Sequence, residues 1–228
     1  KHYSFDLWMT LIKSNPFFKT EKARYFYKNY NTKKKSVEEI MSIFRQVDLM
    51  CTAINEKTGK NIDSDEMHLI VISIMNDFDS CFANIDLCLL YDEMEVLLFN
   101  YIPLVYSNET LNSLDKLRQS NPCSFNISSN TGFIRGRTLR KVLTSLSLSP
   151  FFDFQLYSDE IGWSKPGSRF FDALLDGITG IAANKNIDLT DILHVGDNPN
   201  ADIAGALSAG LNSFLINSNE ATILNLLN

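Results

Sequence analysis

The chain lacks the features that would assign it to several specialised classes of protein. No apolar run in its 228 residues approaches the roughly 20 residues needed to cross a bilayer, so we expect no membrane partner. The net charge is −6, and the one basic run is Lys33-Lys34-Lys35, so we expect no nucleic-acid partner either.

Cysteine is also scarce and is scattered along the sequence. None of the four residues forms a C-x-x-C pair, and no tight Cys/His cluster suggests zinc; they are Cys51, Cys81, Cys88 and Cys123. This distribution favours buried thiols in a reducing compartment and therefore a cytoplasmic location. The hydrophobic fraction of 45% is sufficient for a core, and the length fits one large domain or a core with an insertion.

Between residues 17 and 101 the pattern is helical and glycine is almost absent. Ser36 and Glu39 form a capping-box pattern, and Gly59 suits the end of the helix that follows. Further apolar stripes predict helices over residues 64–78 and 87–101. We therefore expect an all-helical insertion over residues 17–101.

The rest of the chain alternates between strand and helix patterns. Strands are predicted at residues 2–6, 123–127, 153–157, 191–195 and 212–216. Such alternation predicts an α/β fold with a parallel sheet that helices cover on both faces. In these sheets ligands bind beyond the carboxyl ends of the strands.

Two of these predicted strands end in an acidic residue. Asp6 ends the first strand, and Asp197 follows the strand at residues 191–195 in a Gly-Asp turn. A buried carboxylate is costly unless a cation or several N–H donors meet it. Two strand ends can share one Mg²⁺ ion, which takes one or two carboxylates together with water and phosphate oxygens. Asp202, five residues after Asp197, is a further candidate.

Four short motifs in chain order resemble those of the haloacid dehalogenase-like (HAD) hydrolase superfamily. They are Asp6-Leu-Trp-Met-Thr10, Phe125-Asn-Ile-Ser-Ser-Asn130, Ser158-Asp-Glu-Ile-Gly-Trp-Ser-Lys-Pro166 and Gly196-Asp197-x-x-x-x-Asp202. The resemblance implies a Rossmann-like core made of residues 1–16 and 102–228. It also implies that residues 17–101 form a helical cap inserted after the first motif.

The resemblance further implies roles for individual residues. Asp6 would be the nucleophile, and Lys165 would neutralise phosphate charge. Ser129 would hydrogen-bond the transferring phosphoryl group, with Ser128 as the competing choice. Trp8, Thr10 and Asn130 would contact substrate. A Mg²⁺ cofactor would be held by Asp6, the main-chain carbonyl of Trp8, Asp197 and Asp202.

Two residues in these motifs have alternative interpretations. Asp202 could reach the metal through water, hold Lys165, or cap the helix that follows. His194 lies within an apolar strand, and a buried, hydrogen-bonded core histidine is expected there rather than a ligand.

Trp8 departs from the phosphatases that the chain resembles, which carry an aspartate there as general acid and base. An indole N–H can donate a hydrogen bond but cannot cycle a proton at neutral pH. We therefore expect a phosphatase of a small phosphorylated molecule whose proton comes from elsewhere or is not needed. The alternatives are a 2-haloacid dehalogenase, which needs no acid, and a non-catalytic phosphate-binding protein.

Overall fold

A five-stranded parallel sheet forms the centre of the computed structural model, which describes residues 1–79, 85–120 and 122–227. The strand order is β5–β4–β1–β6–β7, and every neighbouring pair is parallel. The strands are β1 (His2–Phe5), β4 (Ser124–Ser129), β5 (Phe154–Tyr157), β6 (Ile192–Gly196) and β7 (Asn212–Leu215). The α/β class and the parallel sheet predicted from the sequence are confirmed.

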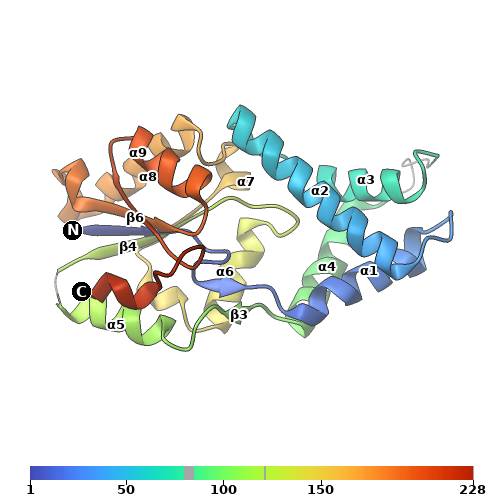
Figure 1. Cartoon of the computed structure of the whole chain (residues 1–228), viewed down its shortest axis with the longest axis horizontal. Coiled ribbons are helices and arrows are strands. Elements are labelled where there is room, and N and C mark those ends of the chain that lie inside the picture. Colours follow the sequence, from blue (N-terminus) through green and yellow to red (C-terminus); the bar gives the residue numbers. More distant parts are fainter. Residues whose placement is uncertain (80–84, 121, 228) are drawn as a thin grey trace.

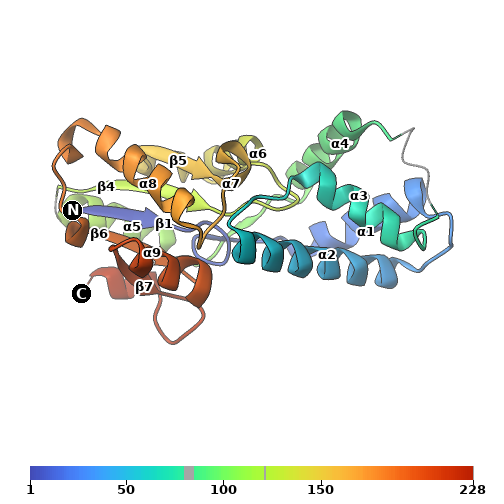
Figure 2. The ribbon, with the colours of Figure 1, turned by 90° about the horizontal axis from the view of Figure 1, so that it is seen from above.

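Helices cover both faces of this sheet (Figures 1 and 2). On one face, α5 (Thr110–Ser120), α6 (Gly136–Ser145) and the C-terminal turn Ile223–Leu227 enclose a large apolar cluster with β1 and β4. On the other, α8 (Ser168–Gly180) and α9 (Gly205–Ser208) enclose a smaller cluster with β6. The short helix α7 (Ser158–Ile161) follows β5 directly.

Four further helices lie together at the end of the molecule opposite both termini (Figure 1). They are α1 (Pro16–Tyr30), α2 (Val37–Thr58), α3 (Ser64–Met75) and α4 (Leu87–Asn100), and we call them the helical segment. The segment has an apolar cluster of its own, which includes Phe26, Phe44 and Val71. The chain leaves and re-enters the sheet-bearing part through the antiparallel pair β2 (Ile12–Lys13) and β3 (Leu104–Val105). Domain boundaries at residues 16/17 and 101/102 stay a prediction.

The ends of these helices follow from local chemistry. Both hydrogen bonds of the Ser36–Glu39 capping box are present, and α2 stops at Gly59, whose φ of 69° is left-handed. The sequence did not define α1 as a separate helix, because Asn15-Pro16 has the composition of a turn. Asn15 instead caps Phe17, and proline is well tolerated in a first helical turn, where its missing N–H is not needed.

Two expectations about the helical segment need correction. The predicted helix at residues 64–78 ends at Met75, because Asp77 and Phe78 take positive φ values of 53° and 61°. Cys88 is exposed, so the prediction of buried thiols is wrong there. Cys51 is buried, Cys123 is half-buried, and Cys81 lies outside the described residues. Within the described part of the chain, no helix is long and apolar enough to span a membrane.

Candidate functional site

Three carboxylates meet at the carboxyl edge of the sheet. Asp6 directly follows β1, and Asp197 directly follows β6, the neighbouring parallel strand. One carboxylate oxygen from each of Asp6, Asp197 and Asp202 lies within 4.8 Å of the other two. The structure therefore brings together the three acids that the sequence proposed.

Lys165 enters the same cluster and is only 1% exposed. Its Nζ donates to Oδ1 of Asp6 at 2.8 Å, to Oδ1 of Asp202 at 2.6 Å and to the Ser128 carbonyl at 2.6 Å. Burial alone would lower the pKa of Lys165, but Asp202 and Asp6 outweigh it and raise the pKa above its ordinary value. The ammonium is thus fully hydrogen-bonded and stays charged.

Asn130 fixes the main chain that carries this lysine. Its Oδ1 accepts from the Lys165 N–H at 2.8 Å, and its Nδ2 donates to the Lys165 carbonyl at 2.9 Å. Both ends of the amide are therefore used within the fold. The predicted contact of Asn130 with substrate stays a prediction, and the observed geometry is that of a residue that positions Lys165.

The two candidate serines of β4 face different surroundings. The Oγ of Ser128 is hydrogen-bonded to the Oγ of Ser4 at 2.7 Å and accepts from Asn126, so it is committed to the sheet. The Oγ of Ser129 donates to the Asn130 carbonyl at 3.1 Å, in the loop beyond the strand. This difference favours Ser129 over Ser128 as the residue that could turn toward a ligand.

Asp202 is engaged on both oxygens. Oδ1 contacts Lys165 and also Nε2 of His194 at 3.1 Å, while Oδ2 accepts from the Asn198 N–H at 3.0 Å. A Cβ at Gly196 would lie 2.2 Å from the Asp202 carboxyl carbon, so glycine is required there. Of the interpretations left open by the sequence, holding Lys165 matches this geometry directly. Its role as a metal ligand stays a prediction.

The loop after β1 orients Asp6. The Oγ1 of Thr10 donates to Oδ2 of Asp6 at 3.2 Å, so Thr10 supports the carboxylate. Met9 takes a positive φ of 58°, and its N–H donates to the Ile12 carbonyl at 2.7 Å, which closes the turn. Trp8 is half-buried and packs against the large apolar cluster. Contacts of Trp8 and Thr10 with substrate stay predictions.

The charges of this cluster suit a divalent cation. Burial and the neighbouring Asp202 raise the pKa of Asp6 to about 7, although Lys165 opposes them. Burial and Asp202 also raise the pKa of Asp197 to about 6. Burial works against ionisation of Asp202 too, but Lys165 and His194 hold its pKa well below the usual range. When all three carboxylates are ionised, they and the Lys165 ammonium leave two uncompensated negative charges on oxygen donors, which is the set that Mg²⁺ prefers.

A network of buried, hydrogen-bonded polar side chains adjoins the carboxylate cluster, and the sequence analysis did not predict it. Nδ1 of His194 is 3.0 Å from the Oγ of Ser4, which continues to Ser128, and His2 is hydrogen-bonded to Asn126 and Ser124. Burial lowers the pKa of His194, and both of its ring nitrogens have partners, as expected of a core histidine. The signal was present in β1, where His2 and Ser4 alternate with Tyr3 and Phe5.

Comparison with known proteins agrees with this geometry. The family model described as HAD-hydrolase-like matches residues 162–226. The human haloacid dehalogenase-like hydrolase domain-containing protein 3 is 35% identical over 80 residues, 35% of this chain and 29% of that protein. The pyrimidine 5′-nucleotidase YjjG of Escherichia coli is 32% identical over 34% of this chain and 32% of its own length. The glyceraldehyde 3-phosphate phosphatase of Methanothermobacter thermautotrophicus is 36% identical over 33% and 30%. The matches thus span about a third of these curated relatives.

Solved structures extend the similarity to nearly the whole chain. The magnesium-bound HAD-hydrolase YfnB from Bacillus subtilis has a TM-score of 0.73 at 18% identity and covers 97% of this chain and 90% of its own. The HAD phosphatase from Thermococcus onnurineus has a TM-score of 0.66 at 20% identity, with 99% and 95% covered. The 2-haloacid dehalogenase from Pseudomonas syringae scores 0.62 at 21% identity, with 95% and 86% covered. The fold of the whole chain is that of the HAD-like hydrolases, and residues 162–226 match their family model.

Proposed function

We propose that this HAD-like hydrolase is a Mg²⁺-dependent phosphatase of a small phosphorylated molecule, with Asp6 as its nucleophile. The observation that carries the proposal is the cluster of Asp6, Asp197 and Asp202 around the buried ammonium of Lys165. The named activities of two relatives, a pyrimidine 5′-nucleotidase and a glyceraldehyde 3-phosphate phosphatase, support a phosphate ester as substrate.

In this mechanism Asp6 attacks the phosphorus atom, the bond to the leaving oxygen breaks, and an aspartyl phosphate forms. Water then attacks the phosphorus, which releases phosphate and restores Asp6. Lys165 neutralises charge on the phosphoryl group, and Thr10 orients Asp6. The Ser129 hydroxyl, which donates to the Asn130 carbonyl, would turn to donate to the phosphoryl group instead. When bound, Mg²⁺ would offset the repulsion between the carboxylates and phosphate, and Asp6, Asp197 and the Trp8 carbonyl would hold it. Asp202 would act mainly by holding Lys165.

We further propose that the helical segment acts as a cap over this site and restricts it to small substrates. Its Glu56 accepts from Nδ2 of Asn198 at 3.1 Å and from Nδ2 of Asn200 at 2.8 Å. These asparagines cap and begin the helical turn Pro199–Ala204, which follows Asp197 and contains Asp202. The Gly59 carbonyl accepts from the Ser164 N–H at 2.9 Å, next to Lys165. The segment therefore contacts both loops that build the site.

Because position 8 is a tryptophan and not an acid, we expect the rate to depend on the leaving group of the phosphate ester. Asp6 has no carboxylic acid beside it at position 8, so the leaving oxygen must depart without a proton from that residue. General acid catalysis contributes about 10²- to 10⁴-fold in rate, so alkyl phosphates should react far more slowly than acyl or aryl phosphates. Trp8 also favours a second candidate, a 2-haloacid dehalogenase, because a halide leaves unprotonated.

The test is release of phosphate from acetyl phosphate, nitrophenyl phosphate and an alkyl phosphate, with Mg²⁺ or with EDTA. We expect hydrolysis only with Mg²⁺, in that order of rate, and none in Asp6→Asn. Asp172→Asn, at an exposed aspartate of α8, is the matched control and should retain activity. Chloride release from 2-chloropropionate in EDTA would instead establish the dehalogenase. Phosphate binding without any turnover would establish a non-catalytic binding protein.

A further inference from the structure

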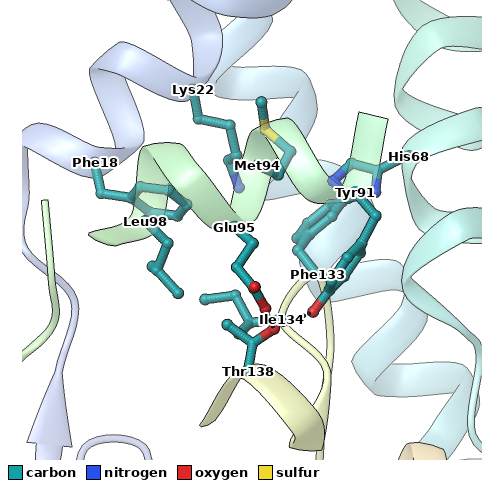
Figure 3. A pocket seen from close by; sticks show the side chains of 10 residues that line it. All are labelled: Phe18, Lys22, His68, Tyr91, Met94, Glu95, Leu98, Phe133, Ile134 and Thr138. Carbon is teal, nitrogen blue, oxygen red and sulfur yellow. Dashed lines mark hydrogen bonds between the residues drawn. The ribbon is translucent and has the colours of Figure 1, made fainter. Parts of the chain in front are cut away.

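A small hollow lies where the helical segment packs against the sheet-bearing part of the molecule (Figure 3). Its walls come from α1, α3 and α4 on one side and from the loop at Phe133 and Ile134 and the start of α6 on the other. The cavity between these walls has space for about one water molecule. Asp6, Asp197, Asp202 and Lys165 are not among its lining residues, so it is separate from the carboxylate cluster.

Lys22 of α1 points into this hollow (Figure 3). The residue is 8% exposed, yet its Nζ makes no hydrogen bond or ion pair within residues 1–79, 85–120 and 122–227. The ammonium instead lies over aromatic rings, at 4.1 Å from the centroid of Phe44, 4.3 Å from Phe133 and 5.5 Å from Phe18. Aromatic faces attract a cation but do not replace the hydrogen bonds that it loses on leaving water.

His68 of α3 supplies a second polar group without a partner. It is 1% exposed, lines the same hollow, and its Nε2 is a buried nitrogen that finds no hydrogen-bond partner in the described chain. Its ring packs between Phe26, at 5.8 Å between ring centroids, and Phe133, at 5.1 Å. A buried polar atom without a partner is rare in folded proteins, so Nε2 of His68, in the same hollow as an ammonium without a counter-ion, points to a missing ligand.

The acidic residues nearby do not supply a counter-ion. Both oxygens of Glu95, which lines the hollow, are taken up by Lys141 and by the hydroxyl of Thr138. Asp48 of α2 pairs with Arg45 at 3.1 Å. Tyr91 is likewise engaged, because its hydroxyl is hydrogen-bonded to Thr138 and accepts from the Arg135 N–H. Lys22 therefore brings a positive charge into the interior that no acidic side chain in the described chain pairs with directly.

We propose that this hollow binds a monovalent anion of about the size of chloride, between the ammonium of Lys22 and Nε2 of His68. The ammonium supplies the charge, and the imidazole donates a hydrogen bond when Nε2 carries the hydrogen. The size of the hollow favours a halide ion over a phosphate or a larger organic anion. Because its walls belong to both parts of the molecule, the anion would hold the helical segment against the Phe133 loop. This site does not depend on the proposed phosphatase activity.

The solution test measures the melting temperature while sodium gluconate is replaced stepwise by sodium chloride or sodium bromide. The total ionic strength is kept constant. Gluconate is too large for the hollow, so it keeps the ionic strength without filling the site. Once chloride or bromide exceeds the Kd, we expect a rise of about 3 to 5 °C for each tenfold increase. Lys22→Met should abolish this rise. Lys19→Met, at an exposed lysine of the same helix, should retain it.

The direct test uses wild-type crystals soaked in sodium bromide and examined by anomalous diffraction. We expect a bromide peak between Lys22 and His68. Density for water alone, together with the same melting temperature in gluconate and in chloride, would overturn the proposal. An equal response to chloride in Lys22→Met and wild type would overturn it as well, because the stabilising anion would then bind elsewhere.

Discussion

Two buried lysines, Lys165 in the carboxylate cluster and Lys22 at the hollow, have opposite electrostatic surroundings. Lys165 is 1% exposed and donates to three oxygens, two of them on carboxylates. Lys22 is 8% exposed and meets aromatic rings. The pKa of Lys165 is raised, whereas burial lowers the pKa of Lys22 to about 8, with partial opposition from Asp48.

The pKa values of the two lysines differ because their contacting groups differ, and not because one lysine is more buried. Taking an ammonium out of water costs several kcal/mol, and only hydrogen-bonded counter-charges recover most of that cost. The carboxylate cluster has an excess of negative charge and can accept a further cation. The hollow at Lys22 has an excess of positive charge and can accept an anion. The two sites therefore predict opposite responses to removal of the lysine.

Lys165→Met should produce the largest effect. The substitution leaves Asp6 and Asp202 buried without their shared cation, so unfolding free energy should fall by about 3–5 kcal/mol. Phosphatase activity should fall by about 10²- to 10³-fold or more. Urea unfolding and single-turnover hydrolysis of acetyl phosphate measure the two effects. Unchanged stability would mean that the ammonium does not hold the cluster together.

Lys22→Met should instead stabilise the protein in chloride-free gluconate, by about 1–3 kcal/mol at pH 7. The folded pKa of about 8 lies below the ordinary value of 10.5, so the unfolded chain binds the proton more tightly. Wild-type stability should therefore rise as the pH increases from about 8 to 10.5. The advantage of Lys22→Met should be constant below pH 8 and shrink above it.

Comparing the two proteins at each pH cancels the titration of groups they share. The charged and titratable neighbours of Lys22 are Lys19 on its own helix, Asp48 on α2, His68 on α3, Glu95 on α4 and Arg135 in the loop before α6. A Lys22→Met protein that is less stable than wild type at pH 7 in gluconate would contradict the account of an uncompensated charge.

Asn130→Ala should have an intermediate effect, because it frees the main chain of Lys165 without touching the ammonium. Two hydrogen bonds are lost, so we expect a cost of about 1–3 kcal/mol in stability. If Asn130 positions Lys165, kcat should fall while KM changes little. A higher KM with unchanged kcat would support the substrate contact predicted from the sequence.

Glu56→Gln should have the smallest effect. The amide keeps one acceptor for Asn198 or Asn200 but loses the charge and the second acceptor, a loss of about 1 kcal/mol or less. The stabilisation by Mg²⁺, measured as the shift in melting temperature, should decrease slightly if this contact orients the Asp197 loop. If Mg²⁺ raises the melting temperature of Glu56→Gln as much as that of wild type, Glu56 serves only to dock the helical segment and does not orient the Asp197 loop.

Sequence reasoning located the carboxylate cluster but not the hollow. Asp6 and Asp197 were found because each ends a buried strand, and the parallel sheet placed both on one edge. The clamp of Asn130 on Lys165 was missed because its hydrogen bonds join loops 35 residues apart and leave no periodic signal. Lys22 resembled any lysine of an amphipathic helix, since only tertiary packing of Phe44 and Phe133 removes it from water.

For the fold as well, features with a local sequence pattern were predicted and features that depend on distant residues were missed. Regular periodicity predicted the five strands, but the two-residue strands β2 and β3 gave no pattern of their own, because their pairing depends on residues 12 and 105 meeting in space. Asn15-Pro16 has the composition of a turn but starts α1, since Asn15 caps the helix. Local signals therefore predicted the element types better than their ends.

The most direct test of the central claim is acid quenching of the Mg²⁺-bound protein during turnover of acetyl phosphate, followed by peptide mass spectrometry. The account predicts a phosphoryl group on the peptide that contains Asp6. The adduct should be absent in EDTA and in Asp6→Asn. A phosphoryl group on another residue, or hydrolysis that continues in Asp6→Asn, would contradict the assignment of Asp6 as the nucleophile.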